Sequence, residues 1–409
     1  MKVHSKQLVS FISVLLMLLL SKTVFWGIEN KGIFQWIFYI SIFIFFVFYG
    51  LNKRKLNDVM LVFIPFSLLF LINIVVYAGE MRSYEINEVI GILLNFLVVA
   101  FVATFVNKQA FIKYYLRIMY VISIISIICF LIATINPQMA RSLCQPDYHW
   151  PDKYGYSFYY TWGWNGDIFA RNSGPFWEPG AFQGFLIFAL LLLLHTRDFA
   201  DIFKIKMRMV ASVFIVAILT TGSTTGYILL VLIVFSNLKA FLRLYSDLSN
   251  RMKFFAAAVI VILPILIVIK SGNISDKLFG DSFASVTSRV TRISDFIGGL
   301  ELIKKNPVIG LGVTPFRDAL KSTYGVNIDD SNGLVSMAYI YGIPMVIYYF
   351  YRFYQGLRYL FAEIKGLQFG IVLVVFVILH MTEGIWWLPI YLYIVFCCRD
   401  YVVPEREIR

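Results

Sequence analysis

The feature that most constrains the fold of this chain is a succession of apolar runs that could each cross a lipid bilayer as a helix. The hydrocarbon core of a bilayer is about 30 Å thick, so a spanning helix needs roughly 20 apolar residues. Hydrophobic residues make up 59% of the 409 positions and charged residues only 15%. The sequence therefore predicts an all-α polytopic membrane protein with about twelve transmembrane helices. The expected helices begin near Gln7, Gly32, Val59, Glu88, Ile118, Ala181, Met209, Gly226, Phe254, Leu334, Leu367 and Ile385.

Two features qualify this helix count and orient it. The turns at Gly222 and Gly384 are very short, so a re-entrant segment is an open alternative at either. If the N-terminus is cytoplasmic, the inner segments carry 22 of the 36 basic residues but only 8 of the 24 acidic ones. Basic residues collect on the cytoplasmic side of membrane proteins, so both termini are expected inside. The first run reaches Trp26 without a cleavage site and is predicted to be a retained anchor.

This topology divides the chain into five segments. Residues 1–135 form the first five helices, 136–180 an outer loop, 181–269 helices six to nine, 270–333 a second outer loop, and 334–409 the last three helices and a cytoplasmic tail. Long loops in an otherwise tightly connected protein are usually functional. The net charge of +12 follows from topology and anionic lipid, so the bilayer, and no nucleic acid, is the expected partner.

The first outer loop ends in Arg171-Asn-Ser-Gly-Pro-Phe-Trp-Glu-Pro-Gly180 and runs straight into an apolar segment. A guanidinium and a carboxylate at the mouth of a membrane helix cost too much desolvation to be retained casually, so we expect a charged ligand there. The alternatives are a snorkelling side chain for Arg171 and a helix cap for Glu178. Aromatic residues of this loop could stack on sugars or simply pack the loop; they include Tyr160, Trp164 and Trp177.

The second outer loop contains an amphipathic pattern over residues 288–305, with apolar side chains at intervals of three or four. We expect a helix that lies on the membrane surface or roofs a cavity. It should end at Pro307, after which Gly310-Leu-Gly312 makes a tight return. Arg289 and Arg292 lie about one turn apart and can share a target.

Four segments of the chain, in their order and spacing, resemble the bacterial O-antigen polymerase and O-antigen ligase superfamily of membrane glycosyltransferases. They cover most of the C-terminal two thirds and read Arg171-Asn-Ser-Gly-Pro-Phe-Trp-Glu-Pro-Gly-Ala181, Leu219-Thr-Thr-Gly-Ser-Thr-Thr-Gly226, Asn306-Pro-Val-Ile-Gly-Leu-Gly312, and Asp329-Asp-Ser-Asn-Gly-Leu334 with Tyr341-Gly-Ile343. The resemblance implies a GT-C-like architecture in the bacterial inner membrane, with two large periplasmic loops and an active site that faces the periplasm.

The resemblance also implies a substrate and a reaction. The substrate is an oligosaccharide linked to undecaprenyl pyrophosphate, and a polymerase moves the growing glycan from this carrier to the terminal sugar of a new lipid-linked repeat. The enzyme is expected to be metal-independent and to need no cofactor, so cationic side chains must stabilise the leaving pyrophosphate. By position, Arg171 and Arg289 match the two most important arginines of the family, and Arg292 is a candidate substrate contact. A chain-length regulator of the inner membrane is a candidate protein partner.

Two departures from the family pattern favour the polymerase over the ligase. Ser331 stands where ligases carry a His before Asn332, and Ser223-Thr224 stands where the family often has Ser-Arg. A ligase and a flippase or transporter of the lipid-linked oligosaccharide are the alternative functions. Because of these departures, the family pattern does not identify the residue that activates the acceptor hydroxyl.

Three acidic residues are candidates for the general base. Glu178 is the first, and Asp329 and Asp330 follow, with ordinary solvated loop acids as the alternative reading. His380 and Glu383 lie three residues apart on a helix and face one way. The pair could line the cavity, with a satisfied pair inside the bundle as the alternative.

Overall fold

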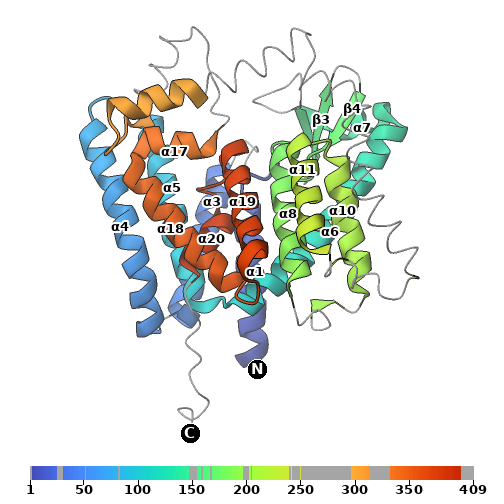
Figure 1. Cartoon of the computed structure of the whole chain (residues 1–409), viewed down its shortest axis with the longest axis horizontal. Coiled ribbons are helices and arrows are strands. Elements are labelled where there is room, and N and C mark those ends of the chain that lie inside the picture. The colour runs from blue at the N-terminus through green and yellow to red at the C-terminus, as the bar shows by residue number, and fades with distance from the viewer. Residues whose placement is uncertain are drawn as a thin grey trace.

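The computed structural model describes residues 2–24, 31–50, 52–81, 83–146, 154–157, 160–165, 168–196, 202–203, 205–238, 241, 249, 296–313 and 332–397. Two regions of the described chain form a helical bundle whose helices run mainly between its two ends (Figure 1). The first region contains α1 (Lys2–Leu19), α3 (Lys31–Phe45), the π-helical turn η1 (Phe46–Gly50), α4 (Lys53–Tyr77), α5 (Ser83–Phe105) and α6 (Lys108–Ile135). The second contains α8 (Pro179–Leu194), α10 (Met207–Thr220), α11 (Thr224–Ser236), α17 (Gly333–Tyr341), α18 (Ile343–Leu360), α19 (Gly366–Thr382) and α20 (Pro389–Phe396).

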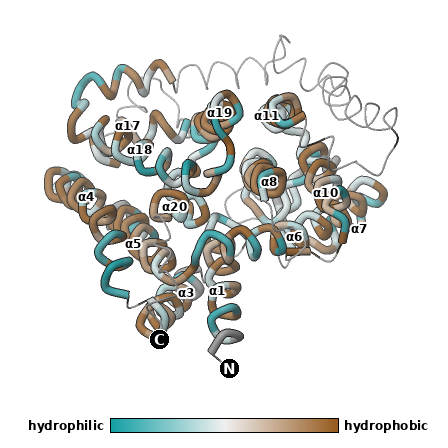
Figure 2. The backbone as a smooth tube through the Cα atoms, turned by 60° about the horizontal axis from the view of Figure 1, so that its bottom comes forward, coloured by the Kyte–Doolittle hydropathy of each residue, from teal (hydrophilic) through white to brown (hydrophobic). Residues whose placement is uncertain are grey.

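The prediction of a helical, membrane-embedded protein is confirmed at this level. Among the described residues, three helices are long and apolar enough to cross a bilayer: α4, α5 from Ile86 on, and α6. Large apolar side chains on their outer faces remain exposed, such as Leu61 on α4 and Val121 on α6, as expected where lipid is the solvent. Hydrophobic residues dominate the helices of the bundle (Figure 2).

Several other helices are shorter than the expected spans. The helices α10 and α11 contain 14 and 13 residues, or about 20 Å each at 1.5 Å per residue, which is less than the hydrocarbon thickness. A single helix was expected from Leu334, but the chain forms α17 and α18 with a break at Gly342. This glycine has a φ of +88°, and a Cβ atom there would lie 2.1 Å from the carbonyl oxygen of Val308. The helix expected from Phe254 lies outside the described residues.

The first outer loop contains secondary structure that the sequence pattern did not predict. A short helix, α7 (Pro137–Leu143), is followed by an antiparallel sheet of β1 (Gln145–Pro146), β2 (Tyr154–Ser157), β3 (Tyr160–Asn165) and β4 (Ile168–Asn172), in the order β1-β2-β3-β4. The sheet lies at one end of the bundle, above α6 and α10 (Figure 1). Tyr160 and Trp162 of β3 pack against Ala133 and Ala140 of α6 and α7. The sheet therefore sets the position of the strand that leads into α8.

The second outer loop is described from residue 296 onward, and residues 296–305 are helical. The helix ends before Pro307, as expected, and Gly310 and Gly312 follow with φ values of +79° and +73°. Asn73 of α4 donates to the carbonyl oxygen of Ile309 at 3.1 Å and to that of Ile340 at 2.8 Å. The segment with the two glycines is therefore a structural joint between the loop, α4 and α17.

The helix α8 lies in the middle of the bundle. Every residue from Ala181 to Leu193 is buried, and helices α6, α10, α11 and α19 pack around α8. An apolar helix that is buried on all sides is the most constrained element of a membrane bundle. Its first turn therefore holds nearby side chains in fixed positions.

Candidate functional site

The chain enters α8 through a turn that its sequence makes rigid. After β4, Gly174 adopts a φ of +54°, and a Cβ atom there would lie 3.0 Å from the ring of Phe182. Phe176 is fully buried and stacks on Phe185 with ring centroids 4.1 Å apart. The backbone N–H of Val24 donates to the carbonyl oxygen of Pro175 at 2.6 Å, which ties the end of the first helical segment to this turn.

Arg171 extends from β4 to the turn between α10 and α11. Its Nε donates to the carbonyl oxygen of Thr221 at 3.0 Å. Gly222 has a φ of +59°, and a Cβ atom there would lie 3.3 Å from Cγ of Arg171. The side chain is half-buried and is held against protein backbone. This arrangement differs from the snorkelling alternative, in which the guanidinium would extend toward the lipid interface.

Asn172 fixes the backbone beside Arg171. Its side-chain amide donates to Oγ of Ser126 at 3.2 Å and to Oγ1 of Thr220 at 2.9 Å, and its Oδ1 accepts from the Tyr160 hydroxyl at 3.2 Å. Burial raises the pKa of the Tyr160 phenol, so the group stays protonated and can donate. Tyr160 thus supports Asn172 from inside the protein, where it is 4% exposed, and does not offer its ring to a sugar at the surface.

Glu178 occupies the N-cap position of α8, but its carboxylate does not cap the helix. No side-chain hydrogen bond reaches the first turn. Its Oε1 instead accepts from Nε1 of Trp177 at 3.0 Å, and both side chains are half-buried. The helix-cap reading therefore applies to the position of the residue and not to its side chain, which is oriented by Trp177.

A second carboxylate, that of Glu383, lies beside Glu178. Glu383 directly follows α19, and its Oε1 occupies the space where Gly180 lacks a side chain. A Cβ atom at Gly180 would lie 2.1 Å from this oxygen, 3.2 Å from Cδ of Glu383 and 4.0 Å from Cδ of Glu178. Two carboxyl groups therefore flank the first turn of α8, where the partial positive charge of the helix N-terminus favours negative charge.

The late motif reaches the same place. Asn332 accepts a hydrogen bond from the N–H of Val335 at 3.1 Å and so caps α17. The next residue, Gly333, packs on the backbone of Glu383, since a Cβ atom there would lie 2.5 Å from the Glu383 carbonyl oxygen. The segments around Gly180 and Gly333 therefore meet at one glutamate, although they are far apart in the sequence.

Lys22 adds a positive charge near this turn. Its Nζ lies 5.2 Å from the ring centroid of Trp177 and 4.9 Å from that of Trp387. Its φ of +53° is the one positive value among the described residues other than glycine, a conformation that is uncommon for a residue with a long side chain. The two indole faces hold the ammonium group by cation–π attraction.

Polar groups continue into the bundle below the carboxylates. Gln183 of α8 is fully buried, and among the described residues neither its Oε1 nor its Nε2 has a hydrogen-bond partner. It fits against Gly226, the last glycine of the middle motif, where a Cβ atom would lie 2.1 Å from its Oε1. Arg171 of the first motif and Gln183, two residues beyond that motif, thus contact the middle motif at Gly222 and at Gly226.

His380 lies in the core and not at the surface of the site. It is fully buried, with Nε2 at 3.1 Å from the Tyr349 hydroxyl and Nδ1 at 2.7 Å from the carbonyl oxygen of Phe376. The hydrogen-bonding groups of His380 are thus satisfied inside the bundle, as the alternative interpretation predicted. The partners are Tyr349 and Phe376, whereas that interpretation paired His380 with Glu383.

The remaining predicted site residues fall outside what the structure describes. They are Arg289, Arg292, Asp329 and Asp330, together with the side chain of Trp164. Sequence reasoning missed Lys22 and Gln183 and treated Glu383 only as a partner of His380. A lone lysine after an apolar run carried no signal, but a glutamine inside an otherwise apolar helix is a detectable one.

The described part of the site thus consists of an arginine, two carboxylates and a lysine held between indole rings around the buried N-terminus of one helix. Comparison of the sequence with family models and with curated proteins finds no match. The functional argument therefore depends on the residues themselves.

Proposed function

We propose that the protein is a membrane glycosyltransferase that polymerises a surface polysaccharide such as O-antigen. The observation that carries the proposal is the meeting of three sequence motifs around the first turn of α8. Through Arg171 the first motif contacts the middle one, and through Glu383 it meets the late motif. Each of these two contacts is made by a charged side chain, and motifs that served only their own loops would have no reason to meet in this way.

The proposed substrate is an oligosaccharide on undecaprenyl pyrophosphate. The hydroxyl oxygen of the acceptor sugar attacks the anomeric carbon of the donor glycan, a new glycosidic bond forms, and the bond from that carbon to the pyrophosphate oxygen breaks. The pyrophosphate leaves on its lipid, and the hydroxyl proton passes to a carboxylate. The bond energy comes from the lipid-linked donor, so no nucleotide sugar is required.

Arg171 is assigned to the pyrophosphate. Its planar guanidinium matches phosphate oxygens and can stabilise the charge that develops as the bond breaks. The hydrogen bond to Thr221 fixes the direction of the side chain before the substrate arrives, which is what preorganised electrostatic stabilisation requires. Arg289 remains the proposed second cation, with Arg292 beside it.

Glu178 and Glu383 are assigned to the acceptor hydroxyl. Their contacts at Gly180 bound the separation of the two carboxyl carbons to about 7 Å, a range at which paired carboxylates act on one glycosidic centre in sugar-processing enzymes. One carboxylate can take the proton while the other orients the hydroxyl. Glu383 thus joins Glu178 as a candidate base. Asp329 and Asp330, in the second outer loop, remain further candidates.

The finer topology belongs to the same proposal. Twelve spans and a GT-C-like arrangement would place the N-terminus of α8 at the periplasmic face of a bacterial inner membrane, with both chain termini in the cytoplasm. The end of the bundle at which α1, α4 and α6 begin would then be cytoplasmic. Positive residues on these first turns support this orientation, among them Lys53, Arg54, Lys55 and Lys108.

The test is the surface glycan of a deletion strain complemented with wild-type or variant protein. A polymerase predicts that deletion leaves single repeats on the acceptor and that the wild-type gene restores a ladder of long chains. Polymer retained on the lipid carrier would instead indicate a ligase, and precursor retained inside the cell would indicate a flippase. Either of these two patterns would overturn the proposal.

A further inference from the structure

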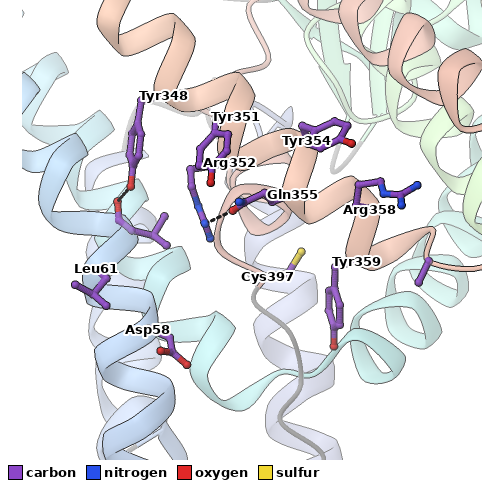
Figure 3. A pocket seen from close by; sticks show the side chains of 12 residues that line it. Asp58, Leu61, Tyr348, Tyr351, Arg352, Tyr354, Gln355, Arg358, Tyr359 and Cys397 are labelled. Carbon is purple, nitrogen blue, oxygen red and sulfur yellow. Dashed lines mark hydrogen bonds between the residues drawn. The ribbon is translucent and has the colours of Figure 1, made fainter.

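A cavity lies far from the start of α8, between the first half of α4 and the last half of α18. Its volume is about 750 Å³, within the range of small-molecule sites. The hydroxyl of Tyr348 donates to the carbonyl oxygen of Val62 at 3.2 Å and joins the two helices at one end of the cavity. Beyond this bond the helices enclose the space that Figure 3 shows, toward the end of the bundle at which α4 begins.

The walls of this cavity carry more positive than negative charge. Arg352 and Arg358 line it from α18, and Asp58 lines it from α4. Arg352 is oriented by a hydrogen bond from its Nη1 to Oε1 of Gln355, and the guanidinium of Arg358 lies 4.9 Å from the ring centroid of Phe369. Three further basic residues stand on the first turn of α4: Lys53, Arg54 and Lys55.

The cavity lies beside a helix that is long enough to cross a membrane, and part of its exposed rim is apolar. Leu61 of α4 is 68% exposed, and Tyr351 of α18 is 54% exposed, and both line the cavity. Asp58 stands in the second turn of α4, one turn before Leu61. Charged and apolar side chains therefore line the same groove (Figure 3), as a ligand with a charged headgroup and acyl chains requires.

We propose that this cavity binds an anionic phospholipid from the leaflet at which α4 begins. Its phosphate pairs with Arg352, because a guanidinium binds two phosphate oxygens at once. Arg358, whose side chain points away from Arg352 in Figure 3, adds positive charge on the other side of the cavity. The Asp58 carboxylate accepts hydrogen bonds from the hydroxyls of a glycerol headgroup, and the Gln355 amide donates to them. The acyl chains lie along Leu61. Basic pockets between membrane helices commonly take such headgroups. The proposal is independent of the glycosyltransferase activity.

The test is lipid titration of the purified full-length protein, followed by native mass spectrometry. Phosphatidylglycerol and phosphatidylcholine with identical acyl chains are the probes. Both lipids carry the phosphate, but the choline of phosphatidylcholine places a second positive charge near the arginines and offers no hydroxyl to Asp58 and Gln355. Wild-type protein should therefore retain phosphatidylglycerol about tenfold more tightly. The double variant Arg352→Gln/Arg358→Gln should lose this preference. Lys113→Gln, which removes a charge from α6 at the same end of the bundle but outside the cavity, should keep it.

Two results with the wild-type protein would overturn the proposal. One is equal retention of the two lipids by the wild type. The other is displacement of phosphatidylglycerol by inorganic phosphate, which would make the cavity a site for a small anion. If the double variant does not fold, Arg358→Gln alone decides, because this side chain is exposed and its loss leaves no buried charge. An unchanged preference in that variant also contradicts lipid binding.

Discussion

Gly180→Ala should move the Glu383 carboxylate without unfolding the protein, and it is therefore the most direct test of the role of that carboxylate. A Cβ atom at residue 180 would lie 2.1 Å from Oε1 of Glu383, whereas ordinary contact begins at 3.4 Å. The carboxylate must therefore retreat by about 1.3 Å. The atom that moves is the far end of a flexible side chain, so the backbone of α8 can stay in place.

The expected change in stability is small. Alanine stabilises a helix relative to glycine by about 0.5–1 kcal/mol, which offsets the modest strain of moving one carboxylate. The expected change in activity is large, because a displacement of about 1 Å in a reacting group can lower a rate by about 100-fold. The rate of chain extension should therefore fall by about two orders of magnitude while the thermal midpoint moves little.

The assay is polymer formation by purified protein with a lipid-linked repeat, together with the thermal midpoint in detergent. Gly370→Ala is the matched control, since it makes the same change within α19, where a Cβ atom meets nothing within 4 Å. The control should extend chains at the wild-type rate. A wild-type rate in Gly180→Ala would refute the role of Glu383. A loss of rate that is accompanied by a large fall in the thermal midpoint would refute the claim that the substitution displaces the carboxylate without unfolding the protein.

Four further substitutions, at three positions, test other parts of the account. Arg171→Ala should abolish chain extension without preventing membrane insertion, and Arg171→Lys should restore it only partly because an ammonium group cannot pair bidentately; gels of the surface glycan measure both. Glu178→Gln can still accept from Trp177, so the fold should be kept while the extension rate drops; an unchanged rate would remove Glu178 as the base and leave Glu383, Asp329 and Asp330. Asn73→Ala removes the side-chain donor of the Ile309 carbonyl and one of two donors of the Ile340 carbonyl, which keeps the N–H of Gly312. It should lower the free energy of unfolding by about 1–2 kcal/mol, seen as a lower thermal midpoint.

The helices that the sequence predicted best are those in which one physical effect dominates. The long apolar runs of α4, α5 and α6 need no partner to be recognised, because length and hydropathy alone identify them. The break at Gly342 was not predicted, since it depends on the approach of Val308 from a distant loop. The sheet before α8 was missed for the same reason: its strands are stabilised by packing against α6 and α7, and local hydropathy does not report that contact.

The candidate site shows a similar division. Arg171 and Glu178 stand out in the sequence because charged residues next to an apolar helix are costly. Glu383 could not be placed, because its position follows from the absence of a side chain at Gly180, more than 200 residues earlier. His380 was expected beside it, yet one helical turn was enough to bury the imidazole between Tyr349 and Phe376.

The most direct test of the central claim is reconstitution of the purified protein in vesicles with a single defined repeat unit on undecaprenyl pyrophosphate. The account predicts a ladder of longer glycans from the wild type, with release of undecaprenyl pyrophosphate, and no ladder from Arg171→Ala. Absence of any longer product from folded wild-type protein, or an equal ladder from Arg171→Ala, would contradict it.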